Sequence, residues 1–166
     1  DSTLMNSAKV SITGNFAGAE DQLTFTPVGG ITGSYSSVDG VLTLSGTATV
    51  ADYQTVLQSV KYHNTSDNPS TLARTITFQV RDNSEVKSTL STRGVTVAAV
   101  NDAPAITMPA PQLVGLSHAL TFSSINGNAM TLADVDAQSG NLQLNLSVTA
   151  GTLTLSTLAG LTGSGD

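Results

Sequence analysis

The sequence contains neither cysteine nor tryptophan, and charged residues make up only 11% of it. Without cysteine the chain can form no disulfide framework and no thiolate metal site. Its two histidines, His63 and His118, then supply too few ligands for a zinc site. No apolar run reaches the roughly 18 residues that a membrane-spanning helix needs, so membrane insertion is not expected.

Basic residues are scarcer than acidic ones, 6 against 12, which gives a net charge of −6. This balance argues against nucleic acid or an anionic membrane as the partner, and it is compatible with cation binding. The basic residues are Lys9, Lys61, Arg74, Arg81, Lys87 and Arg93. The sequence after Pro104 therefore has no Lys or Arg, so Asp134 and Asp136 have no basic residue near them in the sequence.

A hydrophobic content of 39% over 166 residues is enough for one medium domain or two small ones. The abundance of Thr, Ser, Gly and Val favours strands and turns over helices. Alternation of apolar and polar residues predicts strands over residues 9–13, 21–26, 34–36, 41–44, 75–81 and 95–97, and further on over residues 105–107, 120–123, 130–132 and 142–148. Glu20 and Asp21 stand as an acidic pair in a turn, which predicts a solvated surface.

One stretch departs from the strand pattern. Its apolar residues recur at intervals of three, four and three positions, at Val50, Tyr53, Leu57 and Val60. This spacing places them on one face of a helix, so we predict a short helix over residues 51–59 with Tyr53 packed inward. Thr49 is suited to cap the helix, with Asp52 as its capping-box partner.

The stretch from Val95 to Thr107 predicts a boundary between two β domains. Pro104 cannot donate a hydrogen bond to a neighbouring strand and favours an extended Ala103, so one strand should end here and another begin. Asn101 and Asp102 place oxygen-bearing side chains at this boundary. Because calcium takes about 6 to 8 oxygen ligands, including those of Asn and Asp, the boundary is a candidate cation site.

The two halves of the chain share a short motif. The sequence GVLTLS at Gly40–Ser45 matches GTLTLS at Gly151–Ser156, and each copy follows a predicted strand and a turn. The chain therefore contains parts of two related repeats.

Four stretches, taken in order, resemble one family. They are GVLTLSGTATVADYQTVLQSVKYHNTSD at 40–67, NPSTLARTITFQVRDN at 68–83, VNDAP at 100–104 and LADVDAQSGN at 132–141. Together they resemble the cadherin-like tandem repeats of bacterial surface adhesins, including those attached to RTX-type secreted proteins. The resemblance implies an all-β fold of immunoglobulin- and cadherin-like Greek-key sandwich repeats in tandem, with calcium at the junctions between them. The helix predicted above would belong to the first repeat.

The resemblance also implies a division of the chain. Asp1 aligns with Asp136, so residues 1–103 would be a cadherin-like repeat lacking its first strand or strands. Residues 104–166 would then be the first half of a second repeat. The expected partners are neighbouring repeats or identical subunits.

For the cation site, the resemblance implies Asn101 and Asp102 as linker ligands and Asp134 and Asp136 as an Asp-x-Asp pair. Asp82 is a further candidate ligand. In an extended Asp-x-Asp segment both carboxylates point to the same side, so they can share one Ca²⁺. The alternative is that these residues only form turns, since Asp accepts hydrogen bonds from nearby backbone.

These observations favour a non-catalytic extracellular module, a calcium-rigidified repeat of a bacterial surface adhesin or biofilm matrix protein. One alternative is an extracellular filament subunit, in which a strand near residues 105–122 completes the first repeat of the next copy. A second alternative is a carbohydrate-binding module, for which Tyr35, Tyr53 and Tyr62 offer few aromatic platforms. An enzyme is not expected, because neither histidine has a nucleophile-elbow context.

Overall fold

The computed structural model describes residues 3–137, 140–156 and 161–162. The chain divides into two compact units, residues 1–136 and 137–166. The boundary expected between residues 103 and 104 separates sequence repeats, and it stays a prediction. Asp1, expected to align with Asp136, lies outside the described residues.

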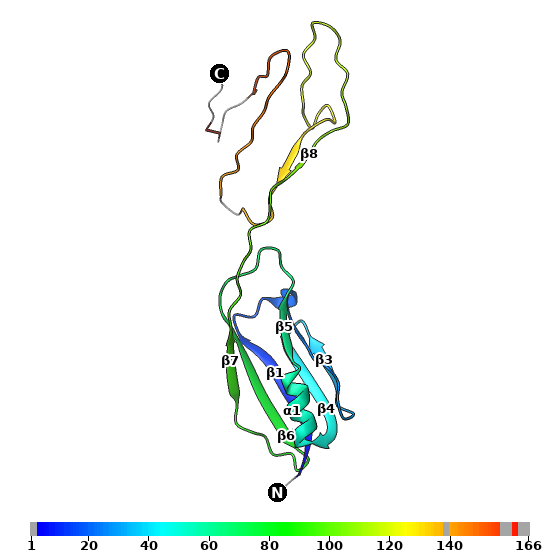
Figure 1. Ribbon diagram of the computed structural model, residues 1–166, viewed down its shortest axis with the longest axis vertical. Helices are drawn as coiled ribbons and strands as arrows, with labels where there is room; N and C mark the ends of the chain where they lie inside the picture. Colours follow the sequence, from blue (N-terminus) through cyan, green and yellow to red (C-terminus); the bar gives the residue numbers. More distant parts are fainter. Residues whose placement is uncertain (1–2, 138–139, 157–160, 163–166) are drawn as a thin grey trace. The chain divides into compact units, whose positions relative to one another are not determined.

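A five-stranded antiparallel sheet dominates the first unit, with the strand order β3-β4-β1-β6-β7 (Figure 1). Its strands are β1 (Leu4–Gly14), β3 (Thr32–Ser36), β4 (Val41–Thr49), β6 (Arg74–Asp82) and β7 (Ser91–Val95). In the central strand, Val10 lies opposite Leu42 of β4 and Phe78 of β6. The alternation predicted for these strands thus places apolar side chains on one face of the sheet.

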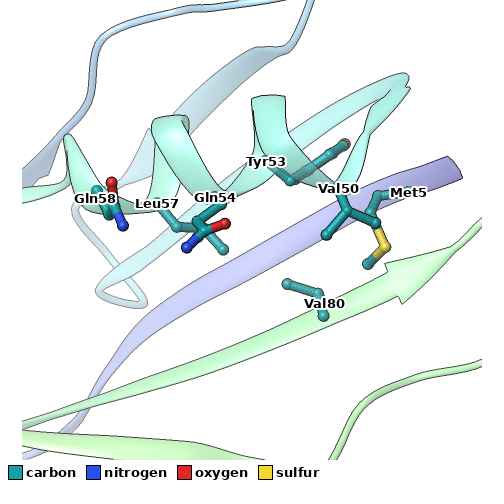
Figure 2. A pocket seen from close by; sticks show the side chains of 7 residues that line it. All are labelled: Met5, Val50, Tyr53, Gln54, Leu57, Gln58 and Val80. Carbon is teal, nitrogen blue, oxygen red and sulfur yellow. The ribbon is translucent and has the colours of Figure 1, made fainter. Parts of the chain in front are cut away.

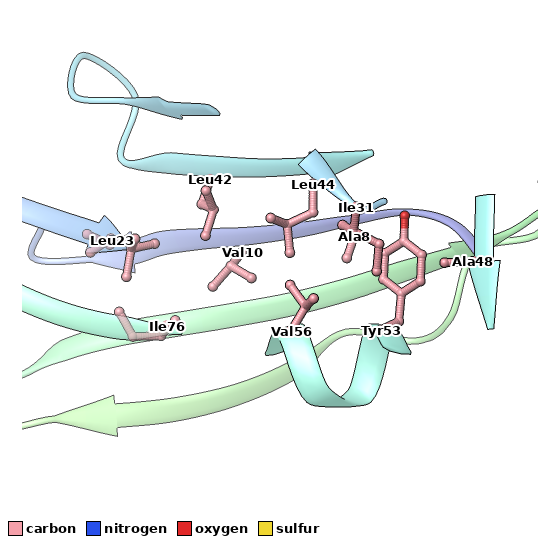
Figure 3. Close-up of a cluster of buried hydrophobic side chains, with 11 residues drawn as sticks. Ala8, Val10, Leu23, Ile31, Leu42, Leu44, Ala48, Tyr53, Val56 and Ile76 are labelled. Carbon is pink, nitrogen blue, oxygen red and sulfur yellow. The ribbon is translucent and has the colours of Figure 1, made fainter. Parts of the chain in front are cut away.

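A second layer covers that face. It comprises the two-stranded antiparallel sheet of β2 (Asp21–Thr24) and β5 (Lys61–Asn64), together with helix α1 (Val50–Gln58). A short 3₁₀ turn, η1 (Gly18–Glu20), precedes β2. The buried core between the layers consists of Ala8, Val10, Ile12, Leu23, Ile31, Leu42, Leu44, Ala48, Tyr53, Val56 and Ile76 (Figure 3). The all-β prediction with one short α-helix is confirmed, and the two layers are consistent with a β-sandwich.

Helix α1 begins and ends one residue earlier than predicted. Its capping box forms as expected: the Asp52 amide donates to Thr49 Oγ1 at 3.1 Å, and the Thr49 amide donates to Asp52 Oδ2 at 3.3 Å. Tyr53 is buried, and its hydroxyl donates to the Gly46 carbonyl at 2.8 Å. Val50, placed on the inner face by its spacing, is instead 54% exposed, while Val56 is fully buried. Val56 follows Tyr53 by three positions and so shares its face.

A small sheet follows the two layers formed by β1–β7 and α1, which we call the first sandwich. β8 (Ala105–Thr107) pairs antiparallel with β9 (Thr131–Ala133), which confirms the strands expected there. The strand expected at residues 120–123 does not form. Asn126 Nδ2 donates to the Thr121 carbonyl at 3.0 Å, and Asn128 Oδ1 accepts from the Ser123 amide at 2.9 Å. These side chains occupy backbone groups that a strand would use for pairing.

The strand expected at residues 142–148 is also absent from the described part of the second unit. Its apolar residues Leu142, Leu144, Leu146 and Val148 are between 42% and 49% exposed. A strand requires a neighbour to accept its backbone hydrogen bonds, and the described residues of this unit provide none. Nowhere in the described ranges is there a helix long and apolar enough to cross a membrane.

Candidate cation site at the junction

The predicted boundary at Pro104 coincides with a break in regular structure. β7 ends at Val95, the next residues carry no regular structure, and β8 begins at Ala105, directly after Pro104. Ala105 lies opposite Ala133 in the small sheet. Because the pairing is antiparallel, the residues that precede β8 and those that follow β9 emerge at the same end of this sheet. The fold thus brings residues 101–102 and 134–136 together.

Hydrogen bonds connect four of the five candidate ligands. The Asp102 amide donates to Asp136 Oδ2 at 3.0 Å. The Asp136 amide donates to Asp134 Oδ1 at 3.3 Å, and Asn101 Nδ2 donates to the Asp102 carbonyl at 2.7 Å. Asn101, Asp102, Asp134 and Asp136 therefore form one group, although 34 positions separate Asp102 from Asp136.

Asp136 carries the feature that best fits a cation. Its Oδ2 accepts the Asp102 amide, whereas its Oδ1 is buried without a hydrogen-bond partner among the described residues. A buried carboxylate oxygen without a donor is unfavourable, and a bound cation would satisfy it. The described residues contain no group of three or more Asp, Glu, His or Cys side chains poised to hold a metal. The amide oxygen of Asn101, backbone carbonyls and water would have to complete the ligand set, and calcium accepts all of these.

Asp82, the fifth candidate, lies elsewhere in the first sandwich. Asp82 is the last residue of β6, and Arg74 is the first. Arg74 pairs with Val95, after which the chain continues to the junction, so Asp82 lies at the end of β6 away from the junction. The length of β6 places Asp82 about 26 Å from Arg74. Asp82 Oδ1 accepts the amides of Ser84 at 2.9 Å and Val86 at 2.8 Å, so Asp82 stabilises the turn after β6. The structure does not bring it to the other four residues.

A contact that the sequence analysis missed reaches the Asp-x-Asp segment from the first sandwich. Asn68 Nδ2 donates to the Val135 carbonyl at 3.4 Å. Asn68 precedes Pro69, and this dipeptide indicates only a turn. The local sequence carries no signal for the contact, because its partner lies 67 positions away.

The first sandwich also contains a buried ion pair. Arg74 Nε donates to Asp21 Oδ2 at 2.8 Å, and both side chains are 0% exposed. The expectation that Asp21 lies on a solvated surface is therefore wrong. Asp21 begins β2, and its side chain faces the core, where Arg74 from β6 neutralises its charge.

Three more donors complete the environment of Asp21. Its Oδ1 accepts the Tyr62 hydroxyl and Asn64 Nδ2, and its Oδ2 accepts the Ala17 amide. Burial alone would raise the pKa of Asp21. The hydrogen bonds from Arg74, Tyr62, Ala17 and Asn64 outweigh this effect and lower the pKa to about 2. Asp21 is thus ionised at neutral pH and has a structural role.

Two surface hollows stand out among the described residues of the first unit. An apolar groove of about 370 Å³ lies beside α1 and is lined by Met5, Val50, Tyr53, Gln54, Leu57, Gln58 and Val80 (Figure 2). A polar hollow of about 550 Å³ on β1, β3 and β4 is lined by Lys9, Ser34, Tyr35, Ser36, Asp39, Val41 and Thr43. Tyr35 is partly buried, and its hydroxyl donates to the Asp21 carbonyl at 2.6 Å, which anchors the ring at the edge of this hollow. Carbohydrate binding stays a prediction.

Comparisons with known proteins give one partial similarity. The chain is 43% identical over 72 residues to halomucin of Haloquadratum walsbyi, a match that covers 40% of this chain. It spans only 1% of the length of halomucin. No protein-family model and no solved structure matches the sequence. The resemblance to cadherin-like adhesin repeats therefore stays a prediction.

Proposed function

We propose that this chain is a non-catalytic structural module of an extracellular surface protein, in which calcium at the junction stiffens the connection between consecutive β-sandwich repeats. The main evidence is the carboxylate of Asp136. One of its oxygens accepts the backbone amide of Asp102 in the linker, and the other is buried without a donor among the described residues. The similarity to halomucin supports a surface location, since that protein's name refers to mucins.

The charges at the junction account for the proposed stiffening. Backbone amide hydrogen bonds link Asp102 to Asp136 and Asp136 to Asp134, and the sequence beyond Pro104 contains no Lys or Arg to offset the charges of these three carboxylates. Without a cation these carboxylates repel one another, so the linker is free to bend. Bound calcium would neutralise these carboxylates and bridge the linker to the Asp-x-Asp segment, with Asn101 as a further ligand.

The proposed function also includes a repeat family. We assign the chain to cadherin-like Greek-key repeats in tandem, as found in bacterial surface adhesins and matrix proteins. The repeated LTLS motif and the two-layer first unit support this assignment. The experiment below tests the mechanical consequence of the assignment.

Small-angle X-ray scattering with light scattering, in calcium and in excess chelator, tests the proposal. We expect a particle of one-chain mass that becomes stiffer in calcium, with binding at about 10⁻⁴ to 10⁻³ M as in other extracellular modules. Asp136→Asn should weaken calcium binding at least about tenfold, because it removes a charged ligand. Asp82→Asn is the matched control and should bind like the wild type, since Asp82 lies at the far end of β6. Indifference of wild-type shape and mass to chelator would remove calcium from the function.

A second candidate is a filament subunit, and the apolar groove beside α1 favours it. Met5, Tyr53 and Leu57 help to line this groove (Figure 2). Elsewhere in the same unit, Leu113, Leu116 and other apolar residues between β8 and β9 are exposed. We infer that a strand near residues 105–122 of one copy completes the first repeat of the next, which would bury both surfaces.

Light scattering across a range of protein concentrations separates the two candidates. Head-to-tail assembly predicts a mass that grows with concentration, because a heterologous contact need not close. Leu57→Glu should suppress this growth by placing a charge in the groove. A monodisperse monomer at high concentration would contradict the filament role.

A further inference from the structure

The loop of residues 65–73, which we name the β5–β6 loop, connects the buried ion pair to the acidic segment at the junction. A chain of hydrogen bonds runs through its first half. Asn64 donates from Nδ2 to Asp21 Oδ1 at 2.8 Å, and its Oδ1 accepts the Ser66 amide at 2.9 Å. Ser66 Oγ accepts the Asn68 amide at 3.2 Å. Asn68 Nδ2 then reaches the Val135 carbonyl at 3.4 Å.

The second half of the loop is attached to the same ion pair. Arg74 Nη1 donates to the carbonyls of Ser70 and Leu72, while its Nε binds Asp21. Asn15 Nδ2 donates to the Ala73 carbonyl at 2.8 Å. Hydrogen bonds from a charged, buried donor are among the stronger ones, so Arg74 holds the second half of the loop, while the neutral side chains of Asn64 and Ser66 hold the first half.

The centre of the acidic segment is exposed, while the residues on either side of it are partly buried. Val135, its central residue, is 55% exposed. The contact from Asn68 is made to the Val135 backbone, so it constrains the path of the chain between Asp134 and Asp136. The Asp102–Asp136 hydrogen bond and the pairing of Ala133 with Ala105 are further links between the acidic segment and the preceding chain.

We propose that Asn68 is a positioning residue, through which the β5–β6 loop holds the Asp134-Val135-Asp136 segment in place before any cation binds. Preorganisation of this kind strengthens binding because less backbone freedom is lost when the ligand arrives. The expected effect of Asn68 on calcium affinity rests on the proposed function. Its expected effect on the order of the Asp134–Asp136 segment in calcium-free protein does not.

Amide hydrogen exchange of Asp102 in calcium-free protein measures the positioning directly, because that amide donates to Asp136 Oδ2. Asn68→Ala should make the Asp102 amide exchange roughly 3- to 10-fold faster, as expected for the loss of one exposed hydrogen bond. Asn68→Asp, which keeps the size and turn preference of the residue but lacks the donor, should act in the same direction. The matched control is Asn6→Ala. It removes a hydrogen bond of 2.8 Å from Asn6 Nδ2 to Glu85 Oε1 at the other end of the sheet, and it should leave the exchange rate of the Asp102 amide unchanged.

Calcium titration of the same variants separates the two proposals. Weaker binding by Asn68→Ala than by Asn6→Ala, with equal global unfolding free energies, supports the positioning role. If the wild type binds no calcium yet Asp102 exchange accelerates in Asn68→Ala, the positioning role stands and the calcium function fails. If Asp102 exchange is the same in Asn68→Ala as in the wild type, the positioning role is overturned, whatever the calcium affinity.

Discussion

The two copies of the LTLS motif have different structures. In GVLTLS, Leu42 and Leu44 are 1% and 0% exposed, and β4 pairs with β1 on one side and β3 on the other. In GTLTLS, Leu153 and Leu155 are 53% and 57% exposed, and no strand forms among the described residues there. Alternation of apolar and polar residues therefore indicates a possible strand. The strand forms only where neighbouring strands accept its backbone hydrogen bonds and pack against its apolar side chains.

Two carboxylates of the first unit, those of Asp21 and Asp136, also differ in how their charge is compensated. Asp21 is buried against Arg74, so the chain supplies its own counter-charge. Asp136 buries an oxygen with no donor among the described residues, in a region of the sequence without Lys or Arg. The carboxylate of Asp21 is neutralised within the fold, although Arg74 Nη2 is buried without a hydrogen-bond partner among the described residues, whereas the free oxygen of Asp136 is suited to a cation from outside.

The largest effect should come from breaking the buried pair. Arg74→Ala leaves the Asp21 carboxylate buried without its counter-charge, which should lower the free energy of unfolding by about 3 to 5 kcal/mol. Arg81→Ala is the matched control, because Arg81 pairs with Glu85 on the surface and such pairs contribute about 0 to 1 kcal/mol. Urea denaturation measures both. Equal losses would mean that burial does not distinguish the two ion pairs.

The comparison of the LTLS copies can be tested by truncating one leucine in each. Leu44→Ala should destabilise the first unit by about 2 to 5 kcal/mol, since it opens a cavity in the core. Leu155→Ala should change the free energy of unfolding by less than about 0.5 kcal/mol, because that side chain is exposed. Thermal and urea unfolding give both values. A loss of similar size in Leu155→Ala would show that Leu155 is packed in solution.

A smaller effect should appear on acidification. The folded pKa of Asp21 is lowered from 3.8 to about 2, so the folded state binds fewer protons than the unfolded state between these values. The stabilising contribution is about 2 kcal/mol; it is fully present above about pH 4 and is lost as the pH falls toward 2. Unfolding free energies of the wild type and Asp21→Asn across this range measure it. An equally steep loss in Asp21→Asn would assign the acid sensitivity to other carboxyl groups.

Several elements could be predicted because their signals are local. The spacing of Tyr53 and Leu57, with Thr49 and Asp52 before them, is sufficient to locate α1 and its cap. Alternation locates β6, and Pro104 marks the start of β8. Greek-key topology, tandem organisation and calcium binding are expectations from resemblance, and they stay predictions.

Other features depend on contacts between distant residues. Adjacent acidic residues favour solvent on average, and only the position of Arg74 53 residues further along makes Asp21 a buried one. The contact of Asn68 with Val135 likewise has no local signal. At residues 120–123 side-chain hydrogen bonds compete with strand pairing, and at residues 142–148 no neighbouring strand is present among the described residues.

The amino-acid sequence by itself determined the all-β character, the capped helix, the break at Pro104 and the residue types of the candidate cation site. These follow from the conformational preferences of residues a few positions apart. Only the tertiary structure decided which alternating segments became strands, which carboxylate pairs with an arginine, and which carboxylate buries one oxygen without a donor in the described chain. Pairing, burial and charge compensation depend on residues that are distant in sequence and meet only when the chain folds.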